Sequence, residues 1–165
     1  MSFRLAAVIP TYNNPATIRR VVEAVRAYVP DVIVVNDGSA EPGRTAVEAL
    51  GADGLAHAVH RETNGGKGAA VKTGLEAAKE LGFTHALQVD ADGQHALDDV
   101  PAFVSIAEES PRSLVLGAPR FDDTAPAARK IGRKITLFWT HLETGGHVIE
   151  DPMCGFRIYP VDAAL

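Results

Sequence analysis

Short apolar runs and amphipathic segments alternate along most of the chain. The apolar runs are bounded by proline, glycine or Asn-Asp turns, which is typical of buried strands. The expected strands are Leu5–Pro10, Val32–Val35, Leu55–His60, Ala86–Val89 and Leu114–Gly117. The segments between them have the apolar spacing of helices. Alternating strands and helices predict a layered α/β domain with a mainly parallel central sheet.

Capping residues indicate where the helices begin and end. Asn14 is a good N-cap, Pro15 fits the first helical position and Pro30 ends that helix. Gly82 ends a later helix as a C′ glycine. The expected helices are residues 15–29, Arg44–Leu50, Lys67–Leu81, Leu97–Glu109 and Ala127–Thr144.

The composition of the chain indicates how many domains it forms and which kinds of molecule it can bind. The 165 residues suit a single domain, residues 1–165, that buries a real core. A net charge of −5 provides no basic field for nucleic acid, so a small molecule is the expected partner. Cys154 is the only cysteine, which excludes an intramolecular disulfide and favours the reducing cytoplasm.

The hydropathy of the chain bears on its location. No uninterrupted apolar stretch reaches 18 residues, and the first apolar run is too short for a signal peptide. We therefore expect a cytoplasmic protein that is soluble or peripheral to the membrane. Tyr159–Leu165 ends without a polar tail, and we expect the natural protein to continue beyond it.

Polar residues follow three of the expected strands. The segments are Pro10–Asn14, Asn36–Ser39 and Asp90–His95. Each alone is compatible with a turn or a helix cap, because Asn, Asp, Gly and Ser dominate such positions. Together they indicate a ligand site, since ligands of parallel α/β sheets collect at the carboxyl ends of the strands.

Asp90 and Asp92 are the strongest local signal. If the backbone there is extended, residues two apart point the same way, so Gln94 would add a third oxygen. Two adjacent carboxylates repel unless a positive charge lies beside them. Mg²⁺ or Mn²⁺ fits such oxygen ligands. The alternative is an ordinary turn in which Asp92 caps the next helix.

Five motifs resemble those of the family 2 glycosyltransferases, in the order of that family. They are Val8–Asn14, Val34–Ser39, Asn64–Ala70, Gln88–His95 and Asp151–Arg157. The resemblance implies the family's Rossmann-like GT-A fold, an α/β/α sandwich. Within the family, the chain is most similar to polyprenyl-phosphate sugar synthases, such as dolichyl-phosphate mannose or glucose synthases.

The resemblance implies an inverting, metal-dependent transfer of a sugar from a UDP- or GDP-linked donor to an acceptor. Asp90, Asp92 and Gln94 match the family's metal ligands, and Asp92 would serve the catalytic step. The implied nucleotide-sugar contacts are Pro10, Thr11, Tyr12, Asn14, Asp37, Lys67, Asp90 and Ala91.

The expected acceptor is a polyprenyl phosphate at the membrane surface. Gly117–Arg120 resembles a Gly-Ser-Arg motif of the lipid-phosphate branch, which implies that Arg120 faces the acceptor phosphate. Arg129, in the basic helix expected over Ala127–Thr144, is the second candidate. That helix, with its apolar stripe, fits either a core-facing helix or one on a membrane surface. Asp151 would be the general base for a hydroxyl acceptor, or would position a phosphate acceptor.

Two other functions stay open. The chain could bind a nucleotide sugar without turnover, because the C-terminal helices usual in the family are absent. It could also be a haloacid-dehalogenase-like phosphatase with Asp90 as the nucleophile. In such phosphatases the Asp-x-Asp motif normally follows the first strand and precedes Thr or Val, whereas here it follows a later strand.

Overall fold

The computed structural model describes residues 2–118 and 154–165. The chain divides into two compact units, Met1–Val115 with Phe156–Leu165, and Leu116–Gly155. The helix expected over Ala127–Thr144 lies outside the described residues, so it stays a prediction. The fold and site below belong to the first unit.

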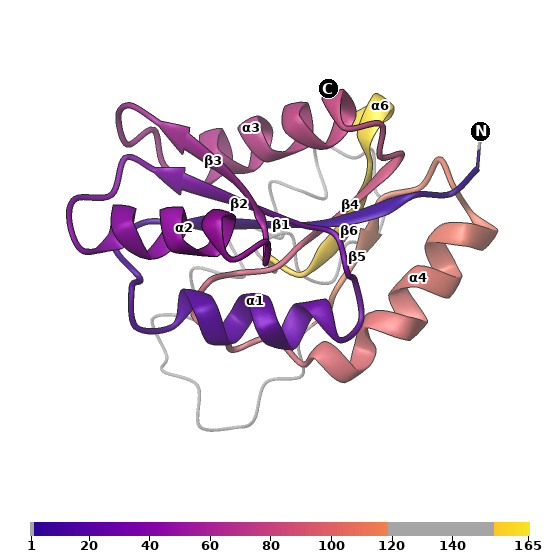
Figure 1. Cartoon of the computed structure of the whole chain (residues 1–165). Helices are drawn as coiled ribbons and strands as arrows, with labels where there is room; N and C mark the ends of the chain where they lie inside the picture. The colour runs from indigo at the N-terminus through magenta and orange to yellow at the C-terminus, as the bar shows by residue number, and fades with distance from the viewer. Residues whose placement is uncertain (1, 119–153) are drawn as a thin grey trace, which may run out of the picture. The chain divides into compact units, whose positions relative to one another are not determined.

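A six-stranded sheet in the order β3-β2-β1-β4-β6-β5 forms the centre of this unit (Figure 1). β1 pairs in parallel with both β2 and β4, β2 pairs in parallel with β3, and β6 is antiparallel to β4. The mainly parallel sheet expected from the sequence is therefore confirmed. The strands are β1 Leu5–Thr11, β2 Val32–Asp37, β3 His57–Arg61, β4 His85–Gln88, β5 Val115–Leu116 and β6 Arg157–Pro160.

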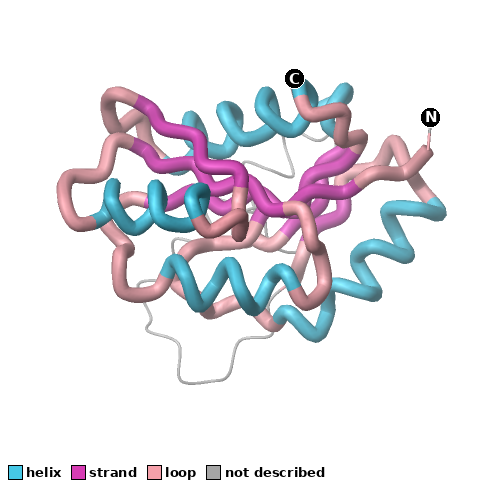
Figure 2. The backbone as a smooth tube through the Cα atoms, in the orientation of Figure 1, coloured by secondary structure: helices cyan, strands magenta, loops and turns pink. Residues whose placement is uncertain are grey.

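Helices cover both faces of the sheet (Figure 2). Helices α1 and α2 contact each other and the sheet on one face, whereas α3 packs on β1 and β2 from the other and contacts α6. None of the helices within residues 2–118 and 154–165 is long and apolar enough to cross a membrane. The helices are α1 Ile18–Arg26, α2 Gly43–Ala52, α3 Lys67–Glu80, α4 Val100–Glu109 and α6 Val161–Ala164, with a 3₁₀ turn, η1, at Leu97–Asp99.

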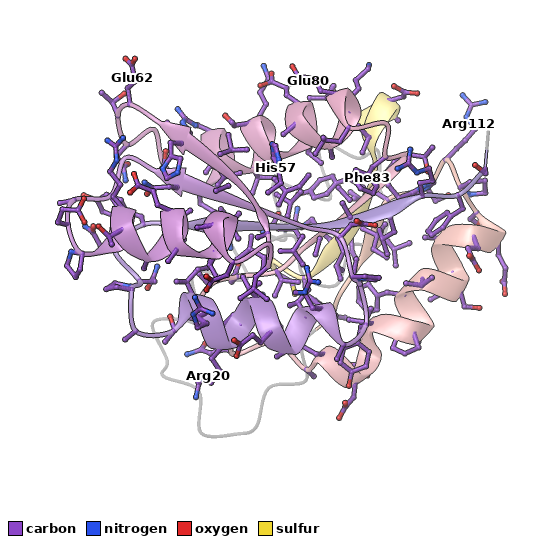
Figure 3. The ribbon with its side chains drawn as sticks, in the orientation of Figure 1. Arg20, His57, Glu62, Glu80, Phe83 and Arg112 are labelled. Atoms are coloured by element: carbon purple, nitrogen blue, oxygen red, sulfur yellow. The ribbon has the colours of Figure 1, made fainter. Side chains whose placement is uncertain are left out.

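The core shows why the strands are continuous apolar runs. All six residues of β2 are buried, because helices cover both faces of the parallel sheet. Ala6 and Val8 of β1 lie in one cluster with the alanine-rich face of α3. Charged side chains such as Arg20 and Glu62 point away from the sheet into solvent (Figure 3).

Most element bounds differ from the predicted ones by one to three residues, and one strand was not predicted. Helix α1 begins at Ile18 and not at residue 15, because residues 15–17 form a turn that the Thr17 amide closes by donating to the Asn14 carbonyl. The Asn14 side chain donates to the Tyr12 carbonyl (3.0 Å) and so does not cap the helix. Strand β6 was not predicted, because its four residues follow the second unit and lack the strand–helix alternation seen earlier in the chain.

Gly38 allows two loops of the sheet edge to touch. Its φ of +71° lies in the left-handed region, which glycine adopts without strain. A Cβ at this position would lie 2.5 Å from the Asn64 amide nitrogen and 2.7 Å from the Thr63 carbonyl carbon. The turn after β2 can therefore approach the loop after β3 only if residue 38 has no side chain.

We expect Gly38→Ala to destabilise the fold by clearly more than Gly54→Ala. Gly54 has a similar φ of +67° but open space around it, so alanine there should cost about 1 kcal/mol, from backbone strain alone. Gly38→Ala must also displace the loop backbone, which should add at least about 1 kcal/mol. Urea denaturation measures both free energies of unfolding. An equal loss of unfolding free energy in the two variants would contradict the close approach of Gly38 to the loop after β3.

Candidate functional site

A cavity of about 370 Å³ opens at the carboxyl ends of β1, β2 and β4. Strand β1 lies between the other two. The chain adds β2 and β3 on one side of β1 and then adds β4 on the opposite side, so the direction of strand order reverses at β1. Such a switch point is where parallel α/β sheets bind ligands. The lining comprises all eight predicted nucleotide-sugar residues and four others: Pro10, Thr11, Tyr12, Asn14, Asp37, Asn64, Gly66, Lys67, Ala70, Asp90, Ala91 and Asp92.

The loop after β1 forms one wall of the cavity. Thr11 is buried at the end of the strand, whereas half of the Tyr12 side chain is exposed. Asn13 ties this loop to the turn after β2, since its amide donates to Ser39 Oγ (3.0 Å) and its Oδ1 accepts from the Ala40 amide (3.1 Å). These two bonds join the first two predicted segments into one surface.

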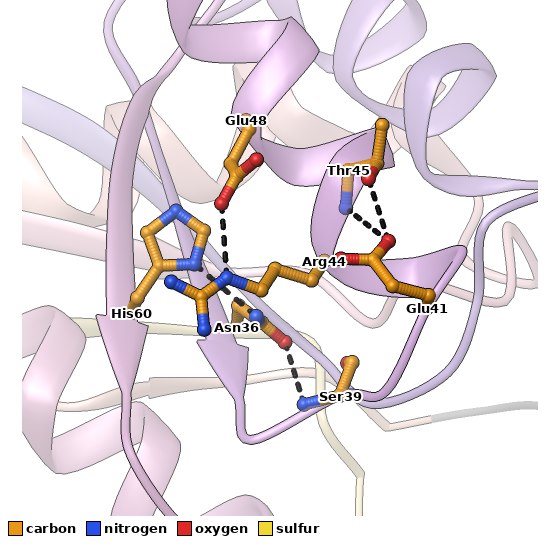
Figure 4. A network of polar contacts seen from close by, with 7 residues as sticks. All are labelled: Asn36, Ser39, Glu41, Arg44, Thr45, Glu48 and His60. Atoms are coloured by element: carbon orange, nitrogen blue, oxygen red, sulfur yellow. Dashed lines mark hydrogen bonds and ion pairs between the residues drawn. The ribbon is translucent and has the colours of Figure 1, made fainter.

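The last two residues of β2, Asn36 and Asp37, have different roles. Asn36 Oδ1 accepts from the Ser39 amide (3.0 Å), and its Nδ2 lies 3.2 Å from His60 Nδ1 (Figure 4). Asn36 therefore holds the turn and does not line the cavity. Asp37 lines it, with only 4% of its side chain exposed.

Two neighbours hold the Asp37 carboxylate. Its Oδ1 accepts from the Gly65 amide (3.0 Å), and Arg61 Nε lies 3.3 Å from the same oxygen. A buried carboxylate is costly unless it is hydrogen-bonded and paired. Asp37 meets both conditions while remaining part of the cavity wall.

Two nitrogen-bearing side chains lie close to the Asp90 carboxylate. Lys67 Nζ lies 2.7 Å from its carboxylate, and His95 Nε2 lies 3.3 Å from Oδ2. Burial alone would raise the pKa of Asp90, but the contacts with His95 and Lys67 outweigh it and hold that pKa well below its usual range. Asp90 is therefore an anion at neutral pH.

A chain of side chains reaches Asp90 from β6. Tyr159 donates to Gln88 Oε1 (3.0 Å), and Gln88 Nε2 lies 3.4 Å from Asp90 Oδ1. Burial raises the pKa of Tyr159, an effect partly offset by the nearby Arg157, so the phenol stays protonated and can donate. Sequence reasoning missed Tyr159, because only the antiparallel pairing of β6 with β4 brings it to this site.

The spacing argument for Asp90, Asp92 and Gln94 is wrong in its geometry. Strand β4 ends at Gln88, and residues 91–93 form a turn, so the backbone is not extended here. Asp92 Oδ1 accepts from the Gln94 amide (3.0 Å) within this turn and does not cap the next helix. Asp90 and Asp92 still line the cavity, whereas Gln94 is not part of its lining.

Helix α3 points its N-terminus at the cavity. Its N-cap is Gly66, with a φ of +84° and no side chain to cap the first amides. Asn64 Oδ1 accepts from the Gly66 amide (3.1 Å) and so shapes the entry to the helix. Free amides and the helix dipole favour an anion at this place. The sequence predicted this role for Lys67 and the amides at the start of its helix, but not for Asn64.

Aromatic stacking supports the far side of Asp90. The His95 ring stacks on Phe156 with centroids 5.1 Å apart, and Phe103 packs against the other part of this cluster, the Phe156 ring, at 4.7 Å. His95, next to the acidic motif in the sequence, thus joins that motif to the described end of the Asp151–Arg157 motif.

Several predicted residues cannot be placed. Asp151, Arg120 and Arg129 lie outside the described residues, so their roles stay predictions. Among residues 2–118 and 154–165, no group of three or more His, Cys, Asp and Glu side chains is placed to hold a metal ion. The carboxylates of Asp90 and Asp92, which both line the cavity, remain the candidate metal ligands.

We expect Asp90→Asn to destabilise the metal-free protein more at pH 7 than at pH 3. The pKa of Asp90 is lower in the folded state than the value of about 3.9 expected when unfolded. Its pairing therefore stabilises the fold fully above that value, and the contribution is lost as pH falls below it. Urea denaturation in EDTA at the two pH values measures the difference from wild type. A difference that does not shrink at pH 3 would contradict the pairing.

Comparison with known proteins places the chain among enzymes of sugar transfer. Residues 6–163 match the family described as Glycosyl transferase family 2. The chain is 30% identical to UDP-N-acetylglucosamine–dolichyl-phosphate N-acetylglucosaminyltransferase of Methanococcus voltae, over 94% of this chain and 69% of that protein. It is 28% identical to undecaprenyl-phosphate mannosyltransferase of Micrococcus luteus, over 96% of this chain and 67% of that protein.

A solved structure with the same fold is glucosyl-3-phosphoglycerate synthase of Mycobacterium tuberculosis in complex with Mn²⁺ and UDP-glucose. It superposes with a TM-score of 0.73 at 21% identity, over 98% of this chain and 57% of that one. The chain thus spans little more than half the length of that enzyme. This likeness confirms the expected GT-A fold, and the two relatives confirm the expected likeness to polyprenyl-phosphate sugar synthases. The chain belongs to glycosyl transferase family 2.

Proposed function

We propose that the cavity binds a nucleoside-diphosphate sugar and that the protein transfers the sugar to a polyprenyl phosphate. One observation carries this proposal: the eight residues assigned to the nucleotide sugar from sequence motifs all line one cavity. They come from three separate strand ends and one helix N-terminus. If these residues only formed unrelated turns at the strand ends, there would be no reason for all eight to line the same cavity.

The chemistry of the cavity suits the two ends of a nucleoside diphosphate. Asp37 offers a carboxylate that can accept from a ring N–H, which both uracil and guanine present. Tyr12, half exposed, offers an aromatic face in the same cavity. Lys67 and the first amides of α3 offer positive charge to the diphosphate.

Asp90 and Asp92 are the residues that would hold a divalent metal. Mg²⁺ and Mn²⁺ take carboxylate oxygens together with water and substrate phosphates, so two carboxylates facing a phosphate site suffice. Asp90 is ionised, as a metal ligand must be, and the Mycobacterium tuberculosis relative of known structure holds Mn²⁺ with UDP-glucose. A bound metal supplies charge neutralisation to the departing diphosphate.

The protein's own residues prepare the donor for attack. Lys67, which neutralises Asp90 in the absence of ligand, has half of its side chain exposed and can pair with a phosphate oxygen instead. Thr17 Oγ1 donates to the Ala91 carbonyl (2.8 Å) and fixes the acidic turn against α1. The acceptor then attacks the anomeric carbon from the face opposite the diphosphate, which inverts that centre.

The acceptor assignment rests on the relatives and on the sequence. The Methanococcus voltae and Micrococcus luteus relatives are named for dolichyl and undecaprenyl phosphates. Arg120 and Arg129 are our candidates for the acceptor phosphate, because a guanidinium stays charged and can grip two phosphate oxygens. A phosphate is already anionic, so Asp151 would position it and need not remove a proton. Such a protein would work at the cytoplasmic face of the membrane.

The other two functions have less support. The phosphatase alternative places the acidic motif after the first strand, whereas here it follows β4. The paired and ionised Asp90 also lies against Lys67 and His95, which compete for its oxygens. A binding domain without turnover would show donor binding but no transfer, so an assay of this chain separates it from the enzyme.

We expect Asp92→Asn and Asp37→Ala to weaken nucleotide binding in different ways. Asp92→Asn should remove the part of the UDP or GDP affinity that depends on Mn²⁺, because that part passes through the metal ligands. Asp37→Ala should weaken binding with Mn²⁺ and with EDTA alike, because a base contact needs no metal. Calorimetric titration of each protein under both conditions measures the two effects. Wild-type affinity that is equal with Mn²⁺ and with EDTA would rule out the metal role.

We expect Arg120→Lys or Arg129→Lys to impair transfer to polyprenyl phosphate while donor affinity stays unchanged. Lysine keeps the positive charge but cannot form the bidentate hydrogen bonds that a guanidinium makes to two phosphate oxygens. The KM for the acceptor should therefore rise or turnover should fall. Transfer assays with polyprenyl phosphate and with neutral glycans measure this effect. Turnover only on neutral glycans, undiminished in the Arg120→Lys protein, would exclude a lipid phosphate as acceptor.

A further inference from the structure

The orientation of Asp37 is set by a residue outside the cavity lining. Arg61 is the last residue of β3, and the parallel register pairs it directly with Asp37 of β2. The two side chains are therefore neighbours by strand pairing, and Arg61 Nε lies 3.3 Å from Asp37 Oδ1. The Arg61 side chain is 22% exposed and that of Asp37 only 4%, so the pair is largely shielded from solvent.

Both contacts of the carboxylate end on the same oxygen. The Gly65 amide donates to Oδ1 at 3.0 Å, on the same atom that Arg61 approaches. Fixing one oxygen from two directions removes the rotation that would exchange Oδ1 and Oδ2. The second oxygen is then the one that Asp37 can present to the cavity that it lines.

Gly65 leaves the space that the Arg61 guanidinium occupies. A Cβ on residue 65 would collide with Arg61 Nη2 and lie 3.1 Å from Arg61 Cζ. A side chain at this position would have to push the guanidinium away. The absence of a side chain at Gly65 and the position of Arg61 are therefore parts of one arrangement.

We propose that Arg61, together with Gly65, is a positioning residue that aims Asp37 Oδ2 at the nucleobase and so selects bases with a ring N–H. This proposal rests on the proposed function, in which Asp37 contacts the base. A fixed carboxylate accepts from N3–H of uracil or N1–H of guanine. It repels the ring nitrogens of cytosine and adenine at the corresponding edge, which are acceptors. A carboxylate free to rotate would discriminate less.

The test compares UDP with N3-methyl-UDP and GDP with N1-methyl-GDP, in which a methyl group replaces the ring N–H. Calorimetric titration at saturating Mn²⁺ is run on wild type, Arg61→Met, Gly65→Ala and Asp37→Ala. Arg44→Met is the matched control, because Arg44 is exposed on α2, pairs with Glu48 (Figure 4) and is not part of the cavity lining. Thermal midpoints are measured for every variant.

Wild type should prefer the unmethylated nucleotide by about tenfold or more, since the hydrogen bond is to a charged acceptor. Arg61→Met and Gly65→Ala should lose most of this preference, mainly through weaker binding of the unmethylated form. Arg44→Met should keep it. If Arg61→Met does not fold, Gly65→Ala still provides the test, because Gly65 is exposed and the substitution is small.

Three outcomes would overturn the proposal. If Arg61→Met weakens both nucleotides equally, Arg61 serves only the fold. If Arg61→Met and Gly65→Ala keep the wild-type preference while Asp37→Ala loses it, Asp37 needs no positioning and the proposed function stands. If Asp37→Ala also keeps the preference, the base contact itself is wrong, and the proposed use of the cavity fails together with this inference.

Discussion

Parallel pairing of β1 with β2 on one side and β4 on the other is the constraint on which the site depends. Parallel strands end at the same edge of a sheet, so this pairing brings the segments after residues 11, 37 and 88 together, although they are far apart in the sequence. Burial on both faces keeps β1 and β2 rigid and almost wholly apolar. Polar chemistry is therefore confined to the last residues of these strands and the loops that follow them, where backbone and side-chain bonds fix it.

Charge balance explains how the acidic turn is tolerated without a ligand. Asp90 is partly buried, and a lone anion there would be costly. Lys67 from the start of α3 compensates this charge, His95 beyond the turn lies against the same carboxylate, and Tyr159 extends the support through Gln88. The site is thus preorganised around a charged carboxylate, and a cation bound there as we propose would replace Lys67 as the positive partner of Asp90.

The sequence predicted the fold and most of the cavity because both depend on local patterns. Apolar runs marked the strands, and Gly82, with a φ of +79°, ends α3 as expected. Motifs at strand ends identified Asp37, Lys67 and Asp90, because the topology of parallel sheets converts sequence order into a shared edge. What local patterns could not supply was the turn at residues 91–93, the later start of α1 and the contacts made by Tyr159 and Arg61. The turn and the start of α1 depend on local bonds of Asp92 and Asn14 that the spacing of residue types does not reveal. The contacts of Arg61 and Tyr159 depend on strand register and on the antiparallel pairing of β6, which only the tertiary structure determines.

The bonds between Asn13 and the turn at Ser39 and Ala40 have a consequence for evolution and engineering. Gly38 adds a second junction, where the turn touches the backbone of Thr63 and Asn64. Three loops that meet in this way cannot vary independently, because a substitution in one alters the geometry available to its neighbours. Mutations that retune donor preference should therefore be epistatic. Grafting a single loop from a relative of different specificity should fail where exchange of all three loops as a block succeeds.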